Sequence, residues 1–175
     1  KSNLISNKDK KVLWIRHFHD SIRIMDLFSL KNSQIIDIGT GAGLPGIPVA
    51  LCLNNTKNQI YLCESRKKKI DFLLNCKEKL HLDNVEVIHE RVENIKNKKF
   101  NYIIGRAVTQ LNSFFSICYN ITEEKTIFLL HKGVHIDKEI DDATKYWNFE
   151  YNLHENQIER GSFIIEVKNL IKSTT

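Results

Sequence analysis

Short apolar runs alternate with longer segments of helical periodicity along most of this chain. The apolar runs are continuous and rich in Ile, Leu and Val, which is typical of strands buried on both faces of a sheet. The segments between them carry apolar residues three and four positions apart, the spacing of one helix face. We expect strands over 34–38, 59–64, 85–89, 102–105 and 126–131, and helices over 46–53, 67–82, 111–121 and 136–147.

The two ends of the chain depart from this alternation. Residues 10–30 carry apolar positions at roughly helical spacing, which predicts one or two short helices before the first strand. Residues 149–153 and 162–167 are two β runs with no helical segment between them, which indicates an antiparallel pair. The whole pattern predicts an α/β fold with a doubly wound, mostly parallel sheet and a C-terminal antiparallel hairpin.

A glycine-rich segment, IIDIGTGAGLPG, lies at residues 35–46 and continues directly from the first expected strand. Such a loop lets a ligand approach the backbone, and ligands of doubly wound sheets bind at the carboxyl ends of the strands. Residues 41–46 match G-x-G-x-x-G, the dinucleotide fingerprint. Residues 37–43 also match D-x-G-x-G-x-G, which belongs to a different cofactor.

Two acidic residues help to choose between these ligands. Glu64 ends the second expected strand about 20 positions after the glycines, where a carboxylate accepts hydrogen bonds from ribose hydroxyls. Asp37 precedes the first glycine, where its charge would repel a pyrophosphate and suit the cationic S-adenosylmethionine. A carboxylate that only hydrogen-bonds to loop amides would also account for Asp37. The pattern favours S-adenosylmethionine over a nicotinamide dinucleotide.

Composition narrows the class of protein further. The chain has 175 residues, of which 42% are hydrophobic, enough for the core of one globular domain. Its net charge of +5 favours a phosphate-rich partner, although a lysine-rich chain carries such a charge without one. The chain has neither a long apolar run nor a signal-peptide pattern, and its four cysteines form no C-x-x-C pair. We therefore expect a cytoplasmic protein with no membrane segment and no metal site.

With these residues in view, the chain resembles the bacterial guanine-N7 methyltransferases of small-subunit ribosomal RNA, also called glucose-inhibited division protein B. The segment DIGTGAGLPGIP at residues 37–48 carries most of the resemblance. RHFHDS at 16–21 is similar to the family's R-H-x-x-D-S signature, and GRAV at 105–108 and HKG at 131–133 resemble its x-R-A-V and L-K-G segments. The resemblance extends from residue 3 to about residue 168.

This resemblance implies a fold and an activity. The fold would be the Rossmann-like class I methyltransferase fold, one domain over residues 1–175 with a helical lead-in over residues 1–32. The family usually has a further helix before Asn3, which we expect this chain to lack. The activity would be methyl transfer from S-adenosylmethionine to N7 of a guanine in 16S rRNA, by a monomer acting on rRNA or the small ribosomal subunit. A NAD-dependent oxidoreductase and a non-enzymatic ribosome-assembly factor are the alternatives.

The resemblance also assigns the cofactor site residue by residue. Loop residues would contact the cofactor, an acid would hold the ribose, two residues after the third strand would flank the adenine, and an arginine would follow the fourth strand. The expected cofactor-binding residues are Asp37, Gly39, Gly41, Leu44, Glu64, Val92, Glu93 and Arg106.

The substrate side of the site is less defined. Guanine N7 has a free lone pair, so its methylation needs no general base, and alignment lowers the barrier. Arg106 is the candidate catalytic residue: it could bind guanine O6 or a phosphate, orient an acid, or form a structural salt bridge. Asp20, in turn, could simply pair with Arg16. The expected substrate-binding residues are Arg16, His17, Asp20 and Lys132.

Overall fold

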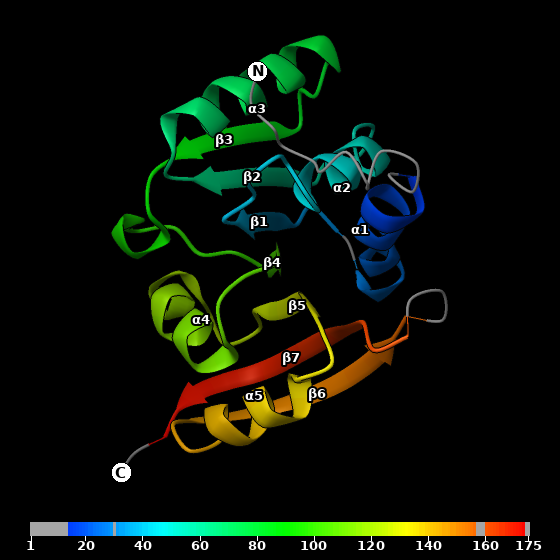
Figure 1. The fold of residues 1–175 in the computed structure, drawn as a ribbon. Coiled ribbons are helices and arrows are strands. Elements are labelled where there is room, and N and C mark those ends of the chain that lie inside the picture. Colours follow the sequence, from blue (N-terminus) through cyan, green and yellow to red (C-terminus); the bar gives the residue numbers. More distant parts are fainter. Residues whose placement is uncertain (1–13, 30, 157–159, 174–175) are drawn as a thin grey trace.

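The computed structural model describes residues 14–29, 31–156 and 160–173, and for residues 14–16 it describes the backbone alone. They form a sheet of seven strands in the order β3-β2-β1-β4-β5-β7-β6 (Figure 1). The strands are β1 (Gln34–Ile38), β2 (Gln59–Glu64), β3 (Val85–His89), β4 (Tyr102–Arg106), β5 (Ile127–Lys132), β6 (Trp147–Glu155) and β7 (Phe163–Lys172).

Strands β1 to β5 are parallel, and the strand order reverses between β1 and β4. These two neighbours pair through apolar residues, with Ile36 opposite Ile103. Strand β7 lies antiparallel to β5 and pairs with β6 in the terminal hairpin. The predicted doubly wound sheet is confirmed, and the glycine-rich loop follows β1 at the reversal point, where such sheets bind ligands.

Helices cover both faces of the sheet and explain why its strands carry continuous apolar runs. Ile35 belongs to the core under α2 and α3, while Ile36 belongs to the core under α4 and α5. The predicted short helices before β1 are also present. The helices are η2 (Trp14–His19), α1 (Asp20–Ile22), η3 (Arg23–Leu27), α2 (Gly46–Cys52), α3 (Lys67–Lys79), η4 (Val92–Asn94), α4 (Leu111–Cys118), η5 (Tyr119–Ile121) and α5 (Ile136–Ala143). None of the helices described is both long and apolar enough to cross a membrane.

Two predicted helix ends are wrong. The expected helix over 67–82 ends at Lys79, and the expected helix over 136–147 ends at Ala143, so that Trp147 begins β6. The indole of Trp147 packs edge-on against Phe115 and donates a hydrogen bond of 2.9 Å to Asn112. Periodicity alone could not anticipate this contact with α4, which fixes Trp147 in the sheet layer. Both hairpin strands are also longer than predicted, because each is extended by pairing with the other.

Candidate functional site

The glycine-rich loop leaves β1 and immediately turns back against β2. The backbone N–H groups of Gly39 and Thr40 donate to the carbonyl oxygen of Cys63, at 2.9 and 3.2 Å. Gly39 and Gly41 have φ angles of 65° and 60°, which favour glycine. A Cβ added to Gly39 would meet no atom within 4 Å. The start of the loop therefore exposes backbone to open space, as a ligand cradle requires.

The later glycines of the loop serve packing instead. A Cβ on Gly43 would come within 2.2 Å of Ile47, and one on Gly46 within 2.3 Å of Leu62. These contacts lie inside the protein, between the loop, α2 and β2. The second half of the literal dinucleotide fingerprint thus lets α2 pack closely against the sheet.

Asp37 is fully buried behind this loop. Its Oδ2 accepts hydrogen bonds from the Thr40 hydroxyl and from the N–H of Gly46, the latter at 2.8 Å. Its Oδ1 has no hydrogen-bond partner among the residues described. Burial raises the pKa of Asp37 to about 7, although both hydrogen bonds oppose the shift. Asp37 therefore braces the loop, the structural role that the sequence left open.

A cavity of about 210 Å³ lies at the carboxyl ends of β1, β2 and β3. Gly39, Glu64, Val92 and Glu93, all expected to bind the cofactor, line it together. The other expected cofactor residues, Asp37, Gly41, Leu44 and Arg106, are not part of its lining. The complete lining consists of Ile38, Gly39, Cys63, Glu64, Ser65, Glu90, Arg91, Val92, Glu93 and Ile117.

Glu64 is held rigidly at this cavity. Its Oε1 accepts hydrogen bonds of 2.9 Å from the backbone N–H groups of Ser65 and Arg66, and its Oε2 lies 3.2 Å from Lys69 Nζ. Burial alone would raise the pKa of Glu64, but the Arg66 amide and the Lys69 ammonium outweigh it and lower that pKa. Glu64 is therefore ionised at neutral pH and oriented to accept hydrogen bonds.

Sequence reasoning missed four polar residues of the cavity lining, Cys63, Ser65, Glu90 and Arg91. Glu90 follows β3 directly, as Glu64 ends β2, so comparing the strand ends could have found it. Its side chain accepts hydrogen bonds from Asn94 and Arg91 at 2.8 Å, which lower its pKa. Cys63 donates to the carbonyl oxygen of Glu90 at 3.4 Å, and burial raises the pKa of this thiol to about 12. The thiol is therefore protonated and not a nucleophile.

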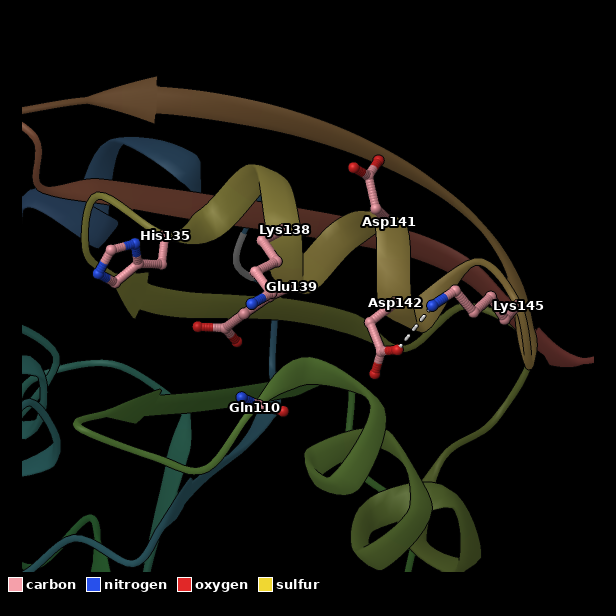
Figure 2. Close-up of a pocket in the computed structure, with 7 residues that line it drawn as sticks. All are labelled: Gln110, His135, Lys138, Glu139, Asp141, Asp142 and Lys145. Carbon is pink, nitrogen blue, oxygen red and sulfur yellow. Dashed lines mark hydrogen bonds and ion pairs between the residues drawn. The ribbon is translucent and has the colours of Figure 1, made fainter.

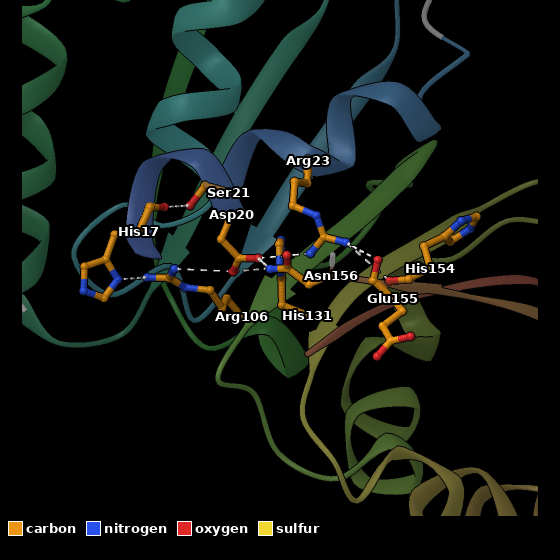
Figure 3. Close-up of polar contacts among 9 residues, drawn as sticks. All are labelled: His17, Asp20, Ser21, Arg23, Arg106, His131, His154, Glu155 and Asn156. Atoms are coloured by element: carbon orange, nitrogen blue, oxygen red, sulfur yellow. Dashed lines mark hydrogen bonds and ion pairs between the residues drawn. The ribbon is translucent and has the colours of Figure 1, made fainter. Parts of the chain in front are cut away.

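A second polar cluster surrounds the buried carboxylate of Asp20 (Figure 3). Its Oδ1 accepts hydrogen bonds from Arg23 at 3.2 Å and Asn156 at 3.1 Å. Its Oδ2 lies 3.3 Å from His131 Nδ1 and 3.9 Å from Arg106 Nη1. Burial alone would raise the pKa of Asp20, but His131, Arg23 and Arg106 outweigh it and lower that pKa.

The same cluster ties the N-terminal helices to the sheet. Arg106 Nη2 lies 3.1 Å from His17 Nδ1, and Arg23 donates to the carbonyl oxygen of Glu155 at 3.0 Å (Figure 3). The structure thus brings Arg106 to His17 and Asp20, although Arg106 lies 89 positions after His17 in the chain. Arg106 forms a structural ion pair with Asp20, one of its proposed roles. The side chain of Arg16 lies outside the described part of the chain.

A family model described as rRNA small subunit methyltransferase G, GidB, matches residues 1–162. The chain belongs to the GidB family.

Individual relatives agree with this assignment. The ribosomal RNA small subunit methyltransferase G of Oenococcus oeni is 36% identical over 152 residues, which cover 83% of this chain and 62% of that protein. The protein of the same name from Bartonella quintana is 36% identical over 171 residues, 96% of this chain and 79% of the relative. The chain therefore spans less than two thirds of the Oenococcus protein.

Solved structures share the fold at much lower identity. A SAM-dependent methyltransferase from Aquifex aeolicus superposes with a TM-score of 0.68 at 17% identity, covering 98% of this chain and 100% of the other. M. jannaschii TYW2 in complex with AdoMet gives 0.66 at 15% identity, covering 94% and 80%. These structures show that the GidB chain has the class I methyltransferase fold predicted from its sequence.

In this GidB chain, Lys132 lies at the end of β5, with its ammonium directed into the protein. Its Nζ lies 2.6 Å from Glu139 Oε2 and donates to the carbonyl oxygen of Thr109 at 2.8 Å. The same Glu139 oxygen accepts the N–H of Leu111 at 3.0 Å. As placed, Lys132 joins β5, α4 and α5, and presents no open ammonium to an RNA phosphate.

A larger hollow of about 540 Å³ lies along α5 (Figure 2). Its walls are mostly charged side chains, such as Asp142, which pairs with Lys145 at 3.1 Å. It contains none of the expected site residues, so the smaller cavity at the strand ends is the candidate cofactor site. The hollow is lined by Gln110, His135, Lys138, Glu139, Asp141, Asp142 and Lys145.

Proposed function

We propose that this chain transfers a methyl group from S-adenosylmethionine to N7 of a guanine in 16S rRNA. The observation that carries the proposal is the cavity at the ends of β1, β2 and β3, which gathers Gly39, Glu64, Val92 and Glu93 in a member of the GidB family. The family supplies the rRNA target, and the guanine N7 position comes from the sequence resemblance.

The site fits S-adenosylmethionine better than a dinucleotide. The cavity lining has three carboxylates, Glu64, Glu90 and Glu93, against one cation, Arg91, an excess of negative charge that would repel a pyrophosphate and attract a cation. Behind the loop, Asp37 Oδ1 is a buried polar atom without a partner in the described residues, and a positive group nearby would favour the ionised form of this carboxyl group. When bound, this cofactor supplies a methyl group on a positively charged sulfur.

The protein's own residues hold and align the reactants. Gly39 lets the ligand approach the backbone, and the fixed carboxylate of Glu64 accepts hydrogen bonds from ribose hydroxyls. Val92 offers an apolar contact beside Glu93. Arg106, fixed by Asp20 and His17, stands at the end of β4, the neighbour of β1. Because guanine N7 has no proton to lose, positioning by these groups is the main task of the chain.

Two measurements test this function. Isothermal titration should show tighter binding of S-adenosylhomocysteine than of NAD, and the opposite order would favour the oxidoreductase. Tritiated S-adenosylmethionine should then label small ribosomal subunits from cells that lack the family's enzyme, at a guanine N7 mapped by reverse transcription. Binding without labelling of subunits or of naked 16S rRNA would favour an assembly factor.

We further propose that the protein acts as a monomer in the cytoplasm, where ribosomal RNA is found. Light scattering coupled to size-exclusion chromatography should give the mass of one chain, 20.4 kDa for these 175 residues. A dimer at micromolar concentration would contradict the monomer.

A further inference from the structure

The helix after Glu64 begins within a run of four cations, Arg66 to Lys69. Positive charges in the first turn of a helix are opposed by the helix dipole. Arg66, Lys67 and Lys68 are exposed, but Lys69 is partly covered, with 31% of its side chain accessible compared with 70% for Lys67. Lys69 is thus the cation of this run that turns toward the protein.

The ammonium of Lys69 lies between Glu64 and the glycine-rich loop. Its Nζ is 3.2 Å from Glu64 Oε2, and a Cβ added to Gly41 would lie 3.6 Å from the same Nζ. The other oxygen of Glu64 already accepts two backbone hydrogen bonds, from Ser65 and Arg66. The oxygen left to accept from a ligand is therefore the one beside Lys69.

The ion pair between Lys69 and Glu64 contributes little to the stability of the fold. An ion pair whose lysine is about one third exposed is screened by water, and a long side chain loses rotamer freedom when it is held in one place. Lys67, two residues earlier, pairs with Asp71 at 2.9 Å on the solvent side of α3. A lysine at the start of this helix can therefore form an ion pair on the solvent side, as Lys67 does. That Lys69 is instead directed toward Glu64 suggests that its ammonium contacts a ligand.

The chemistry of a ribose fits this pair. Each hydroxyl both donates and accepts, whereas a carboxylate only accepts and an ammonium only donates. Lys69 has three N–H bonds, and its contact with Glu64 uses one of them. We propose that Lys69 is a second ribose-binding residue, which donates to a hydroxyl oxygen while Glu64 accepts from a hydroxyl proton. The inference rests on the proposed function, because it places the adenosine of the cofactor in this cavity.

Calorimetric titration with S-adenosylhomocysteine and its 2′-deoxy and 3′-deoxy analogues tests the proposal. Lys69→Met keeps the length and apolar stem of the side chain and removes its donors. The variant should bind S-adenosylhomocysteine about tenfold more weakly, since a charge-assisted hydrogen bond is lost. Against at least one deoxy analogue the weakening should be much smaller, because the hydroxyl that Lys69 contacts is already missing.

Matched variants separate this role from general charge and folding effects. Lys68→Met removes one exposed cation from the same run and should leave all three affinities unchanged. Lys69→Arg keeps the donors and should restore part of the binding. Melting temperatures test whether each variant folds. If Lys69→Met does not fold, Lys69→Gln takes its place, because glutamine keeps a donor without the charge.

Three results would overturn the inference. Unchanged or tighter binding by Lys69→Met would mean that Lys69 only shields Glu64 and must be displaced. Equal weakening toward all three ligands would mean that Lys69 supplies charge and recognises no hydroxyl. Failure of the unmodified protein to bind S-adenosylhomocysteine would overturn the proposed function as well, whereas the first two results leave that function intact.

Discussion

The two buried aspartates, Asp20 in α1 and Asp37 in β1, have opposite electrostatic surroundings. Asp20 is surrounded by Arg23, Arg106 and His131, and its pKa is lowered. Asp37 has only a hydroxyl and an amide as donors, and burial raises its pKa to about 7. Burial by itself therefore does not set the charge of a carboxyl group. That charge is set by the neighbouring groups that replace the lost contacts with water.

This difference separates a structural cluster around Asp20 from the candidate ligand site beside Asp37. Around Asp20, both carboxylate oxygens have partners within the protein, and the cluster fastens the N-terminal helices to β4, β5 and the end of β6 (Figure 3). Around Asp37, one oxygen lacks a partner in the described residues, and the adjacent loop opens toward an acidic cavity. Both oxygens of Asp20 are thus occupied within the protein, whereas one oxygen of Asp37 is not used by any described residue.

The largest expected effect is a change in pH dependence in Asp37→Asn. In the folded protein Asp37 stays protonated up to a pH of about 7, but in the unfolded chain it ionises near its ordinary pKa of 3.8. Its contribution to stability is therefore full below pH 3.8 and is lost as pH rises through 7. Relative to Asp37→Asn, the unmodified protein should lose on the order of 4 kcal/mol of unfolding free energy between pH 4 and 8.

Urea unfolding of both proteins across this pH range measures the difference. Asn is isosteric and keeps an acceptor for Thr40 and Gly46, so the loop should stay in place. Parallel stability curves would show that Asp37 is ionised in the folded protein at ordinary pH and would remove the contrast with Asp20.

The second prediction concerns Asp20→Ala. The substitution leaves Arg23 and Arg106 without their buried counter-ion, so we expect a loss of about 3 kcal/mol at pH 7. Because the pKa of Asp20 is lowered, its contribution is present above pH 3.8 and is lost as pH falls below that value. Urea unfolding at pH 7 and at pH 3.5 should show the difference narrowing under acid conditions.

Asp142→Ala is the matched control for this loss. It also removes an aspartate paired with a cation, Lys145, but its side chain is 45% exposed. We expect a change within about 0.5 kcal/mol, as for other exposed ion pairs. Equal losses in the two variants would mean that the Asp20 cluster is no stronger than a surface pair.

The smallest expected effect is on ligand affinity, in Gly39→Val. The added side chain would point into open space beside the cavity and would force a branched residue to adopt a φ of 65°. Affinity for S-adenosylhomocysteine should fall on the order of a hundredfold, equivalent to about 2.7 kcal/mol. Gly133→Val, which also adds a side chain where nothing lies within 4 Å, should bind normally. Near-normal affinity of Gly39→Val would refute the position of the ligand.

The sequence predicts the sheet well because its signals are local. Each parallel strand is a short apolar run between polar turns. The point where the strand order reverses is recognisable in the sequence from the glycine-rich loop. The end of α5 could not be placed in this way, because Trp147 is fixed by Asn112 and Phe115 on another helix. Such a contact leaves no trace in the periodicity around Trp147.

In the candidate site, too, some features could be predicted from the sequence and others could not. Gly39, Val92 and Glu93 were expected from the family resemblance and Glu64 from its place at a strand end. They line one cavity because each follows or ends a strand, and parallel strands carry their carboxyl ends to one edge of the sheet. Lys132 shows what the sequence could not predict. Its segment suggested an RNA contact, but its ammonium is directed to Glu139 and Thr109. The direction of a side chain depends on what packs against it.

The sequence by itself determined the fold class, the position of the glycine-rich loop and the family, since these rest on residues close together in the chain. Only the tertiary structure decided how the charged residues are used. Asp20 meets Asn156 across 136 positions, and Lys69 turns toward Glu64 while Lys67 turns to solvent. The physical reason is that the ionisation and direction of a polar side chain depend on burial and nearby charges, which exist only once the chain has folded.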